Sequence, residues 1–281
     1  MNIKLIALDL DGTLLDSLKR LSPANEAALR RCTSQGIHIV PATGRMWDGV
    51  PESVRSIPGV RYGIVANGGR VVDALENKEI STALIPVNLA VELMEFASRS
   101  KGTFDPYLDG RGAMEPRFLD HLGDYGVEPK IQELVKATRD AVPDSIAYVK
   151  KCNRPVEKIN MFFADQEERA RVRRALEQRP ELAVSSSLYN NLEINAAGAT
   201  KGNGILSLAR YLGISAEETM AFGDGENDLS MIREAGIGVV MGNGLDILKQ
   251  CADYITDTND RDGVARAIEK LVFASKGLLE E

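Results

Sequence analysis

Short apolar segments that each run straight into a polar cluster are the feature that most constrains the fold of this chain. Residues 3–8 form such a segment, and the acidic sequence DLDGT follows at once. Similar segments lie at 37–40 and 62–66, each ending in a turn-like polar sequence. Apolar runs of this length are typical of strands buried on both faces of a parallel sheet. Residues 22–36 combine a helix start signal, an apolar stripe and a glycine stop, and so predict a helix between the first two strands.

The strand and helix alternation is interrupted in the middle of the chain. From about residue 84 it gives way to a mixed order of predicted strands (103–108, 158–163, 182–187, 191–195) and predicted helices (87–99, 131–139, 167–179). It returns near Ala199, with helices at 203–211 and 263–273 and strands at 219–222 and 236–240. We therefore predict an α/β protein: a Rossmann-like parallel sheet core made of residues 1–83 and 188–281, with an inserted α+β cap domain at 84–187.

Charge and composition exclude several classes of function. The net charge is -7, which argues against nucleic acid as a partner because nucleic-acid binding needs clustered Lys and Arg. An anionic substrate would need a local cation to reverse the sign of the field at the site. The 3 cysteines are scattered and only 2 histidines occur, so neither a disulfide framework nor a histidine-rich zinc site is expected.

The cellular setting is predicted from what the sequence lacks. There is no basic, apolar and cleavable leader at the N-terminus, and no apolar run reaches the ~18 residues of a membrane span. We expect a cytoplasmic protein without membrane contact. No oligomer interface is readable from the sequence, so a monomer is expected.

A pair of acids directly follows the first strand. Asp9 and Asp11 point to the same side if the extended geometry continues. Such a pair can divide the roles of nucleophile and general acid/base, and Asp9, nearer the strand, is the better-fixed nucleophile. Gly12 permits the turn and Thr13 is able to hydrogen-bond locally. Taken alone, the sequence fits an acidic turn equally well, because Asp-Gly turns are common.

A second acidic cluster, GDGEND at 223–228, follows the strand at 219–222. Asp224, Asn227 and Asp228 offer the oxygen ligands that suit a hard cation such as Mg²⁺, and the spacing is not that of an EF-hand. Taken alone, a solvated acidic helix start is an equal alternative. Ligands in open α/β sheets lie beyond the carboxyl ends of the strands, so we expect both acidic clusters to converge on one site.

Other positions at strand and helix ends are candidates for binding an anion. Thr43 and Gly44 offer a hydroxyl and an amide that can hold phosphate oxygens. Lys201 opens a helix, where its charge opposes the helix dipole, and a bound anion would explain that placement. Simpler interpretations are a local turn at Thr43 and a surface side chain at Lys201. Arg45 and Asn67 are further candidates for substrate binding, although Asn67 precedes a glycine in a typical turn sequence.

Taken together, these motifs resemble those of the haloacid dehalogenase superfamily of phosphatases. DLDGT at 9–13 is similar to its first motif, Thr43 to its second, Lys201 to its third and GDGEND at 223–228 to its fourth, in the same order. ATGR at 42–45, the Asn67-Gly68 pair and NDRDGVA at 259–265 are similar to the Cof-type subfamily, which carries a type IIB cap. The middle of the chain resembles that cap in size and position.

The resemblance implies a Mg²⁺-dependent phosphatase of small phosphorylated metabolites, with sugar phosphates as the expected class. Asp9 would attack phosphorus and form an aspartyl-phosphate. Asp11 would protonate the departing oxygen and then take a proton from the hydrolytic water. Charge in the transition state is spread over the phosphoryl oxygens, so positioning and cations would supply most of the catalysis.

The resemblance also implies a set of binding residues. Mg²⁺ would be held by the Asp9 carboxylate, the Asp11 backbone carbonyl and Asp224, with Asn227 and Asp228 supporting the metal. Phosphoryl oxygens would be bound by Thr43, Lys201 and the backbone N–H groups of Leu10 and Gly44. Polar residues of the cap are expected to be structural more often than substrate-contacting; these are Tyr107, Asp109, Arg111, Lys158 and Asn160.

Two alternatives remain open at this point. A phosphosugar mutase would share the motifs and the cap and would differ in transferring phosphate instead of releasing it. A phospho-accepting receiver protein would also place acids, a threonine and a lysine around Mg²⁺ on a parallel sheet. The chain length, the inserted module and Asp11 oppose the receiver interpretation.

Overall fold

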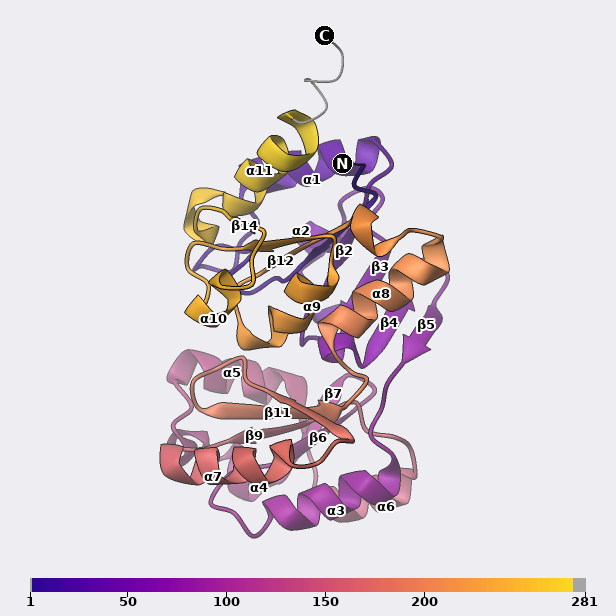
Figure 1. The fold of residues 1–281 in the computed structure, drawn as a ribbon. Coiled ribbons are helices and arrows are strands. Elements are labelled where there is room, and N and C mark those ends of the chain that lie inside the picture. The colour runs from indigo at the N-terminus through magenta and orange to yellow at the C-terminus, as the bar shows by residue number, and fades with distance from the viewer. Residues whose placement is uncertain (1, 275–281) are drawn as a thin grey trace. The chain divides into compact units, whose positions relative to one another are not determined.

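The protein divides into two units. Figure 1 colours the chain by residue number, so the segments of each unit can be traced in it. The computed structural model describes residues 2–274. We call the residues up to Thr82 and from Thr200 onward the core unit, and Ala83–Ala199 the inserted unit. Residues 1 and 275–281, which the predicted core domain included, lie outside the described residues.

The core unit is built on a five-stranded sheet with the order β14-β13-β12-β1-β2. All of its strand pairs are parallel. β1 lies between β12 and β2, so a residue that follows β1 leaves the sheet between two neighbouring strand ends. The strands are β1 (Leu5–Leu8), β2 (His38–Pro41), β12 (Thr219–Gly223), β13 (Ile237–Val240) and β14 (Tyr254–Ile255).

A three-stranded antiparallel sheet adjoins β2. It consists of β3 (Tyr62–Val65), β4 (Arg70–Asp73) and β5 (Lys78–Thr82). The N–H group of Thr43 donates to the Ile64 carbonyl at 2.8 Å, which ties the residues after β2 to β3. The backbone of the predicted threonine motif is therefore held by a neighbouring strand.

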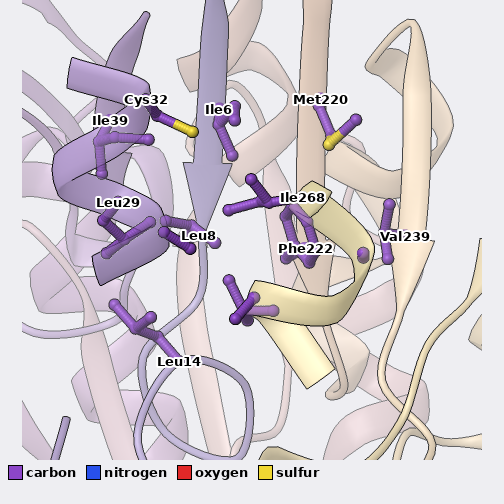
Figure 2. Close-up of a cluster of buried hydrophobic side chains, with 14 of the residues drawn as sticks. Ile6, Leu8, Leu14, Leu29, Cys32, Ile39, Met220, Phe222, Val239 and Ile268 are labelled. Carbon is purple, nitrogen blue, oxygen red and sulfur yellow. The ribbon is translucent and has the colours of Figure 1, made fainter. Parts of the chain in front are cut away.

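Helices cover both faces of the core sheet. Successive side chains of β1 point to opposite faces, so each face carries apolar residues that a helix buries. Ile6 and Leu8 pack with residues of α1 (Pro23–Ser34) and α11 (Gly263–Ile268), as Figure 2 shows. Leu5 and Ala7 belong to a second cluster, which includes residues of α8 (Lys201–Leu212) and α9 (Leu229–Glu234). Two fully apolar faces on one strand confirm the predicted buried parallel sheet.

The remaining helical elements of the core unit are short. Ser215 and Glu218 form a capping box. Within the part of the chain that the structure describes, no helix is long and apolar enough to cross a membrane. The short helical elements of the core unit are α2 (Glu52–Arg55), α10 (Asp246–Lys249), η1 (Trp47–Gly49), η2 (Ala66–Gly68), η4 (Ala216–Glu218), η5 (Glu226–Asp228), η6 (Asn259–Arg261) and the π-helical turn η7 (Glu269–Phe273).

The inserted unit has a six-stranded sheet and a hydrophobic core of its own. The strand order is β10-β11-β9-β6-β7-β8, and only the β7–β8 pair is parallel. Its strands are β6 (Asp105–Leu108), β7 (Arg111–Met114), β8 (Arg139–Ala141), β9 (Ile159–Phe162), β10 (Leu182–Ser185) and β11 (Asn191–Ala196). Its helices are α3 (Val87–Ala97), α4 (Pro116–Leu119), η3 (Leu122–Tyr125), α5 (Pro129–Thr138), α6 (Ser145–Cys152) and α7 (Gln166–Glu177).

The predicted fold class, a parallel α/β core with an inserted α+β domain, is confirmed. One predicted boundary needs correction. The predicted core domain resumes at residue 188, whereas the core unit of the structure resumes at Thr200. The reason is β11, which pairs with β9 and β10 and therefore belongs to the sheet of the inserted unit.

Candidate active site

Asp9 leaves the carboxyl end of β1 with its backbone fixed on both sides. Its N–H group donates to the Phe222 carbonyl of β12 at 3.0 Å, and its carbonyl accepts from the Leu14 N–H at 3.2 Å. The residue is only 6% exposed. The backbone of the predicted nucleophile is thus held by β12 and by the loop that follows β1.

Lys201 is the first residue of α8, and its side chain is fully buried against two carboxylates. Its Nζ lies 2.7 Å from Asp9 Oδ1 and 2.6 Å from Asp228 Oδ1. Burial lowers the pKa of Lys201, but Asp228 and Asp9 outweigh burial and raise that pKa above its ordinary value. These two anions explain why a lysine occupies a helix start, where the helix dipole alone would disfavour it.

Asp228 organises the acidic loop after β12. Its Oδ2 accepts from the N–H groups of Asp224 and Gly225, both at 2.9 Å, while its Oδ1 contacts Lys201. Gly223 is required here, because a Cβ at that position would lie 2.4 Å from the Cβ of Asp228. The loop therefore folds back on itself and holds the Asp224 backbone beside Asp228.

The two acidic clusters meet directly. Thr13 Oγ1 donates to Asp224 Oδ1 at 2.7 Å, although the sequence analysis gave Thr13 only a local role. Gly12 has a φ of +91°, and a Cβ there would lie 2.4 Å from Asp224 Oδ2. A glycine at residue 12 thus serves both the turn and the close approach of the second cluster.

Asp9, Asp224 and Asp228 place carboxylate oxygens within 4.8 Å of one another. Burial, followed by repulsion from neighbouring carboxylates, raises the pKa of Asp224 to about 6. Burial also raises the pKa of Asp9 to about 8, even though Lys201 acts in the opposite direction. At this cluster, burial and repulsion between the carboxylates therefore outweigh the charge of Lys201. Converging carboxylate oxygens that one ammonium does not neutralise fit a hard divalent cation.

Asp11 lies apart from that carboxylate group and is clamped by two cations. Arg45 donates through Nε to Oδ2 at 2.9 Å and through Nη2 to Oδ1 at 2.7 Å, and Lys19 Nζ lies 2.8 Å from Oδ1. Burial raises the pKa of Asp11, but Arg45 and Lys19 outweigh burial and hold that pKa below its ordinary value. Arg45, a candidate for substrate binding, also donates to the Gly49 carbonyl at 2.9 Å.

The threonine motif and the Asn67 turn lie next to each other. Thr43 is buried, its Oγ1 accepts from the Arg45 N–H at 3.2 Å, and its carbonyl accepts from the Asn67 N–H at 3.0 Å. Asn67 lies in the predicted turn with a left-handed φ of 56°, and its Oδ1 accepts from Asn227 Nδ2 at 3.1 Å. A Cβ on Gly44 would lie 3.0 Å from Asn67 Oδ1. Asn67 thus joins the second motif to the fourth.

Sequence reasoning missed two contacts that hold the loop after Asp9. The side chain of Asn243 donates to the Gly12 carbonyl at 2.8 Å, and Lys19 reaches Asp11 from a turn later in the chain. The position of Asn243 just after β13 was a usable signal, whereas no pattern marks Lys19. Leu10, predicted to offer its N–H group, has a buried side chain and a carbonyl that accepts from the Leu15 N–H at 2.9 Å.

The polar candidates of the inserted unit contact other residues of that unit. Lys158 Nζ lies 2.5 Å from Glu193 Oε1, and Asn160 Nδ2 donates to Asp105 Oδ1 at 3.1 Å. Three further candidates follow the same rule: Asp109 pairs with Arg154, Arg111 pairs with Asp140, and the Tyr107 ring lies beneath the Arg139 and Lys158 cations.

Comparison with known proteins finds one family along nearly the whole chain. The model of the haloacid dehalogenase-like hydrolases matches residues 6–268. A 5-amino-6-(5-phospho-D-ribitylamino)uracil phosphatase of Bacillus subtilis is 31% identical, over 97% of both chains. The structure of a haloacid dehalogenase-like hydrolase from Bacillus subtilis is 30% identical, has a TM-score of 0.83, and is matched over 96% of this chain and 100% of that one. A subclass IIB sugar phosphatase is 25% identical with a TM-score of 0.79, over 95% and 98% of the two chains.

Proposed function

Since the chain belongs to the haloacid dehalogenase-like hydrolases and is a phosphatase, we propose that it hydrolyses small phosphorylated metabolites, sugar phosphates in particular, by way of an aspartyl-phosphate on Asp9. The observation that carries this proposal is the contact of Lys201 with Asp9 and Asp228 beside Asp224. This contact places a buried carboxylate, an ammonium group and further acidic side chains together at one strand end. Phosphoryl transfer to a carboxylate needs such an arrangement.

The first half-reaction moves the phosphoryl group to the protein. An oxygen of the Asp9 carboxylate forms a bond to phosphorus while the bond from phosphorus to the leaving-group oxygen breaks. Asp11 in its protonated form, which Arg45 and Lys19 disfavour in the free protein, gives its proton to that oxygen, so an alcohol departs. Lys201, the Thr43 hydroxyl and the N–H groups of Leu10 and Gly44 bind the phosphoryl oxygens and offset their charge.

The second half-reaction restores Asp9. Asp11 takes a proton from a water molecule whose oxygen attacks phosphorus, and the bond between phosphorus and the Asp9 oxygen breaks. Inorganic phosphate leaves, Asp9 returns as a carboxylate and Asp11 is again protonated. The backbone bonds of Asp9 to Phe222 and Leu14 hold the reacting oxygen in place through both steps.

Mg²⁺ is the proposed cofactor. Asp9, Asp224 and the Asp11 backbone carbonyl would hold it, while Asp228 and Asn227 support the loop that carries Asp224. When bound, it supplies positive charge for the phosphoryl oxygens.

Selection of the leaving group is the role proposed for the inserted unit. Asn160 is the cross-strand partner of both Asp105 and Glu193, so these three polar side chains share one face of the sheet. All three side chains are buried, so a sugar hydroxyl would bind to them by replacing a contact within the unit, such as that of Asn160 with Asp105. The subclass IIB sugar phosphatase, matched over 95% of this chain, supports this choice of substrate class.

Metal dependence is the first test. With a panel of sugar phosphates we expect phosphate release in Mg²⁺ and a loss of at least about 100-fold in EDTA, restored by added Mg²⁺. Substrate consumption and phosphate release should agree, because transfer to a second hydroxyl would consume substrate without releasing phosphate. Rates that are equal with and without the chelator would contradict the metal assignment.

The pH dependence of stability gives a second readout of the same cation. Folding raises the pKa of Asp9 from 3.8 to about 8. In the metal-free protein the Asp9 carboxyl therefore contributes fully to the stability of the fold below pH 3.8, and this stabilisation is lost as the pH rises through about 8. Mg²⁺ competes with the proton, so it should raise Tm by several degrees at about pH 9 and by much less at about pH 5. An equal shift at both pH values would argue that the cation binds elsewhere.

The role of Asp11 can be tested separately from that of Asp9. Asp11→Asn removes a proton donor, and we expect kcat/KM for an alkyl phosphate to fall about 10²–10⁴-fold. p-Nitrophenyl phosphate has a leaving group that departs without a proton, so its kcat/KM should fall far less. Asp246→Asn, at an exposed aspartate of α10, is the matched control. An equal loss on both substrates would contradict proton donation by Asp11.

A further inference from the structure

Lys19 is held by a turn with many hydrogen bonds. Asp16 Oδ1 accepts from the N–H groups of Leu18 at 2.9 Å and Arg20 at 2.8 Å, and the Lys19 N–H donates to the Asp16 carbonyl at 2.8 Å. Ser17 fastens the turn to Asp260 through its N–H group at 2.8 Å and its Oγ at 2.6 Å.

The backbone of Lys19 is itself unusual. Its φ is +61°, a left-handed conformation that is uncommon for residues other than glycine, asparagine and aspartate. A lysine gains nothing from this conformation, and glycine or asparagine would adopt it with less strain. The surrounding hydrogen bonds therefore hold the residue in a fixed direction despite a local cost.

That direction leads to Asp11. Lys19 Nζ lies 2.8 Å from Asp11 Oδ1, the same oxygen that accepts from Arg45 Nη2 at 2.7 Å. Lys19 and Asp11 also line one polar cavity of about 430 Å³, together with Asn243 and Asp260. The two cations reach Asp11 from different elements, Arg45 from the segment after β2 and Lys19 from the 16–20 turn.

We propose that Lys19 is a positioning residue for Asp11: its ammonium, acting with the Arg45 guanidinium, sets the direction in which the Asp11 carboxyl faces the leaving-group oxygen. Arg45 alone fixes the plane of the carboxyl group through its two parallel hydrogen bonds. Lys19 adds a contact to one oxygen from a second element, which limits rotation of the side chain. This inference rests on the proposed proton transfer by Asp11.

The test compares two substrates in the variant Lys19→Met. We expect kcat/KM for an alkyl phosphate to fall about 10-fold, because a misplaced acid donates its proton less efficiently. A rise would overturn the proposal, because it would mean that Lys19 acts by lowering the pKa of Asp11 and not by positioning its carboxyl group. kcat/KM for p-nitrophenyl phosphate should change less than about 2-fold, because its leaving group needs no proton. A change in Tm alone, with both rates unaltered, would overturn the proposal and leave Lys19 a structural role.

Two further variants separate the ammonium from the turn. Lys19→Asn removes the ammonium and favours the left-handed backbone, so it should show the same selective loss as Lys19→Met. Lys19→Arg keeps a cation and should recover most of the alkyl phosphate rate. Lys4→Met is the matched control, since Lys4 pairs with Glu218 at 2.6 Å beside the opposite end of β1. Full activity in Lys19→Asn would overturn the proposal.

A double-mutant cycle distinguishes action through Asp11 from direct contact with substrate. In the Asp11→Asn background, Lys19→Met should lower kcat/KM for the alkyl phosphate by less than about 2-fold. A persisting loss of about 10-fold would mean that Lys19 binds the substrate itself, and would overturn this inference while leaving the role of Asp11 intact. An alkyl phosphate rate that Asp11→Asn leaves unchanged would instead remove the proposed role of Asp11, and with it the role of Lys19.

Discussion

Asp9→Asn is expected to lower phosphate release by at least about 10⁴-fold while the protein stays folded. An amide nitrogen or oxygen cannot take the place of the carboxylate as nucleophile, and loss of a nucleophile has an effect of this order in other enzymes. The fold should tolerate the change, because asparagine has nearly the same shape as aspartate and its Oδ1 can still accept from Lys201 Nζ. Lys201 keeps its contact with Asp228 at 2.6 Å.

The measurement is phosphate release from the best substrate of the panel, together with a thermal melt. Tm should lie within a few degrees of the unmodified protein, which separates lost chemistry from lost structure. Asp246→Asn makes the same chemical change at an exposed helix position and should retain full activity. Turnover retained in Asp9→Asn at more than about a tenth of the original rate would remove Asp9 as the nucleophile.

Lys201→Met is expected to damage both stability and catalysis. The ammonium is fully buried and contacts Asp9 and Asp228, so its removal leaves two buried carboxylates without their cation. Breaking a buried ion pair by removing one partner costs about 3–5 kcal/mol in the free energy of unfolding. Activity should fall about 10³-fold, because the same group is proposed to bind the phosphoryl oxygens.

Urea denaturation and the rate of phosphate release measure the two effects. Lys136→Met changes an exposed lysine of α5 and should alter neither. Adding Asp228→Asn to Lys201→Met should restore part of the lost stability, because part of the cost is an unpaired charge. A Lys201→Met protein as stable and as active as the original would show that the buried contact matters for neither property.

The parallel core and its site could be predicted because each depends on a local pattern. The apolar run before Asp9 predicted β1, and the sequence Asn67-Gly68 predicted a turn, which the structure confirms. The convergence of the acidic clusters followed from a general property of α/β sheets, that strand ends meet at one edge. The hydrogen bond from Thr13 to Asp224, 2.7 Å long, confirms that the two acidic clusters meet.

What escaped prediction depends on contacts between distant residues. Strands β4 and β5 mix polar and apolar residues, so no apolar run marks them. The boundary at residue 188 was misplaced because β11 carries no change of composition, only a pairing with β9 and β10. The clamp on Asp11 needs the fold of the 16–20 turn, and no spacing in the sequence reveals that Lys19 faces back toward Asp11.

The pairing of β1 with β12 has a consequence for how the enzyme is made on the ribosome. Leu5 pairs with Thr219, so β1 finds its early neighbour β2 first and must wait for β12 until most of the chain has been translated. The strands of the inserted unit all lie between Ala83 and Ala199 and find their partners earlier. A message broken before the codon for Thr219 therefore yields a chain that contains Asp9, the proposed nucleophile, but lacks β12.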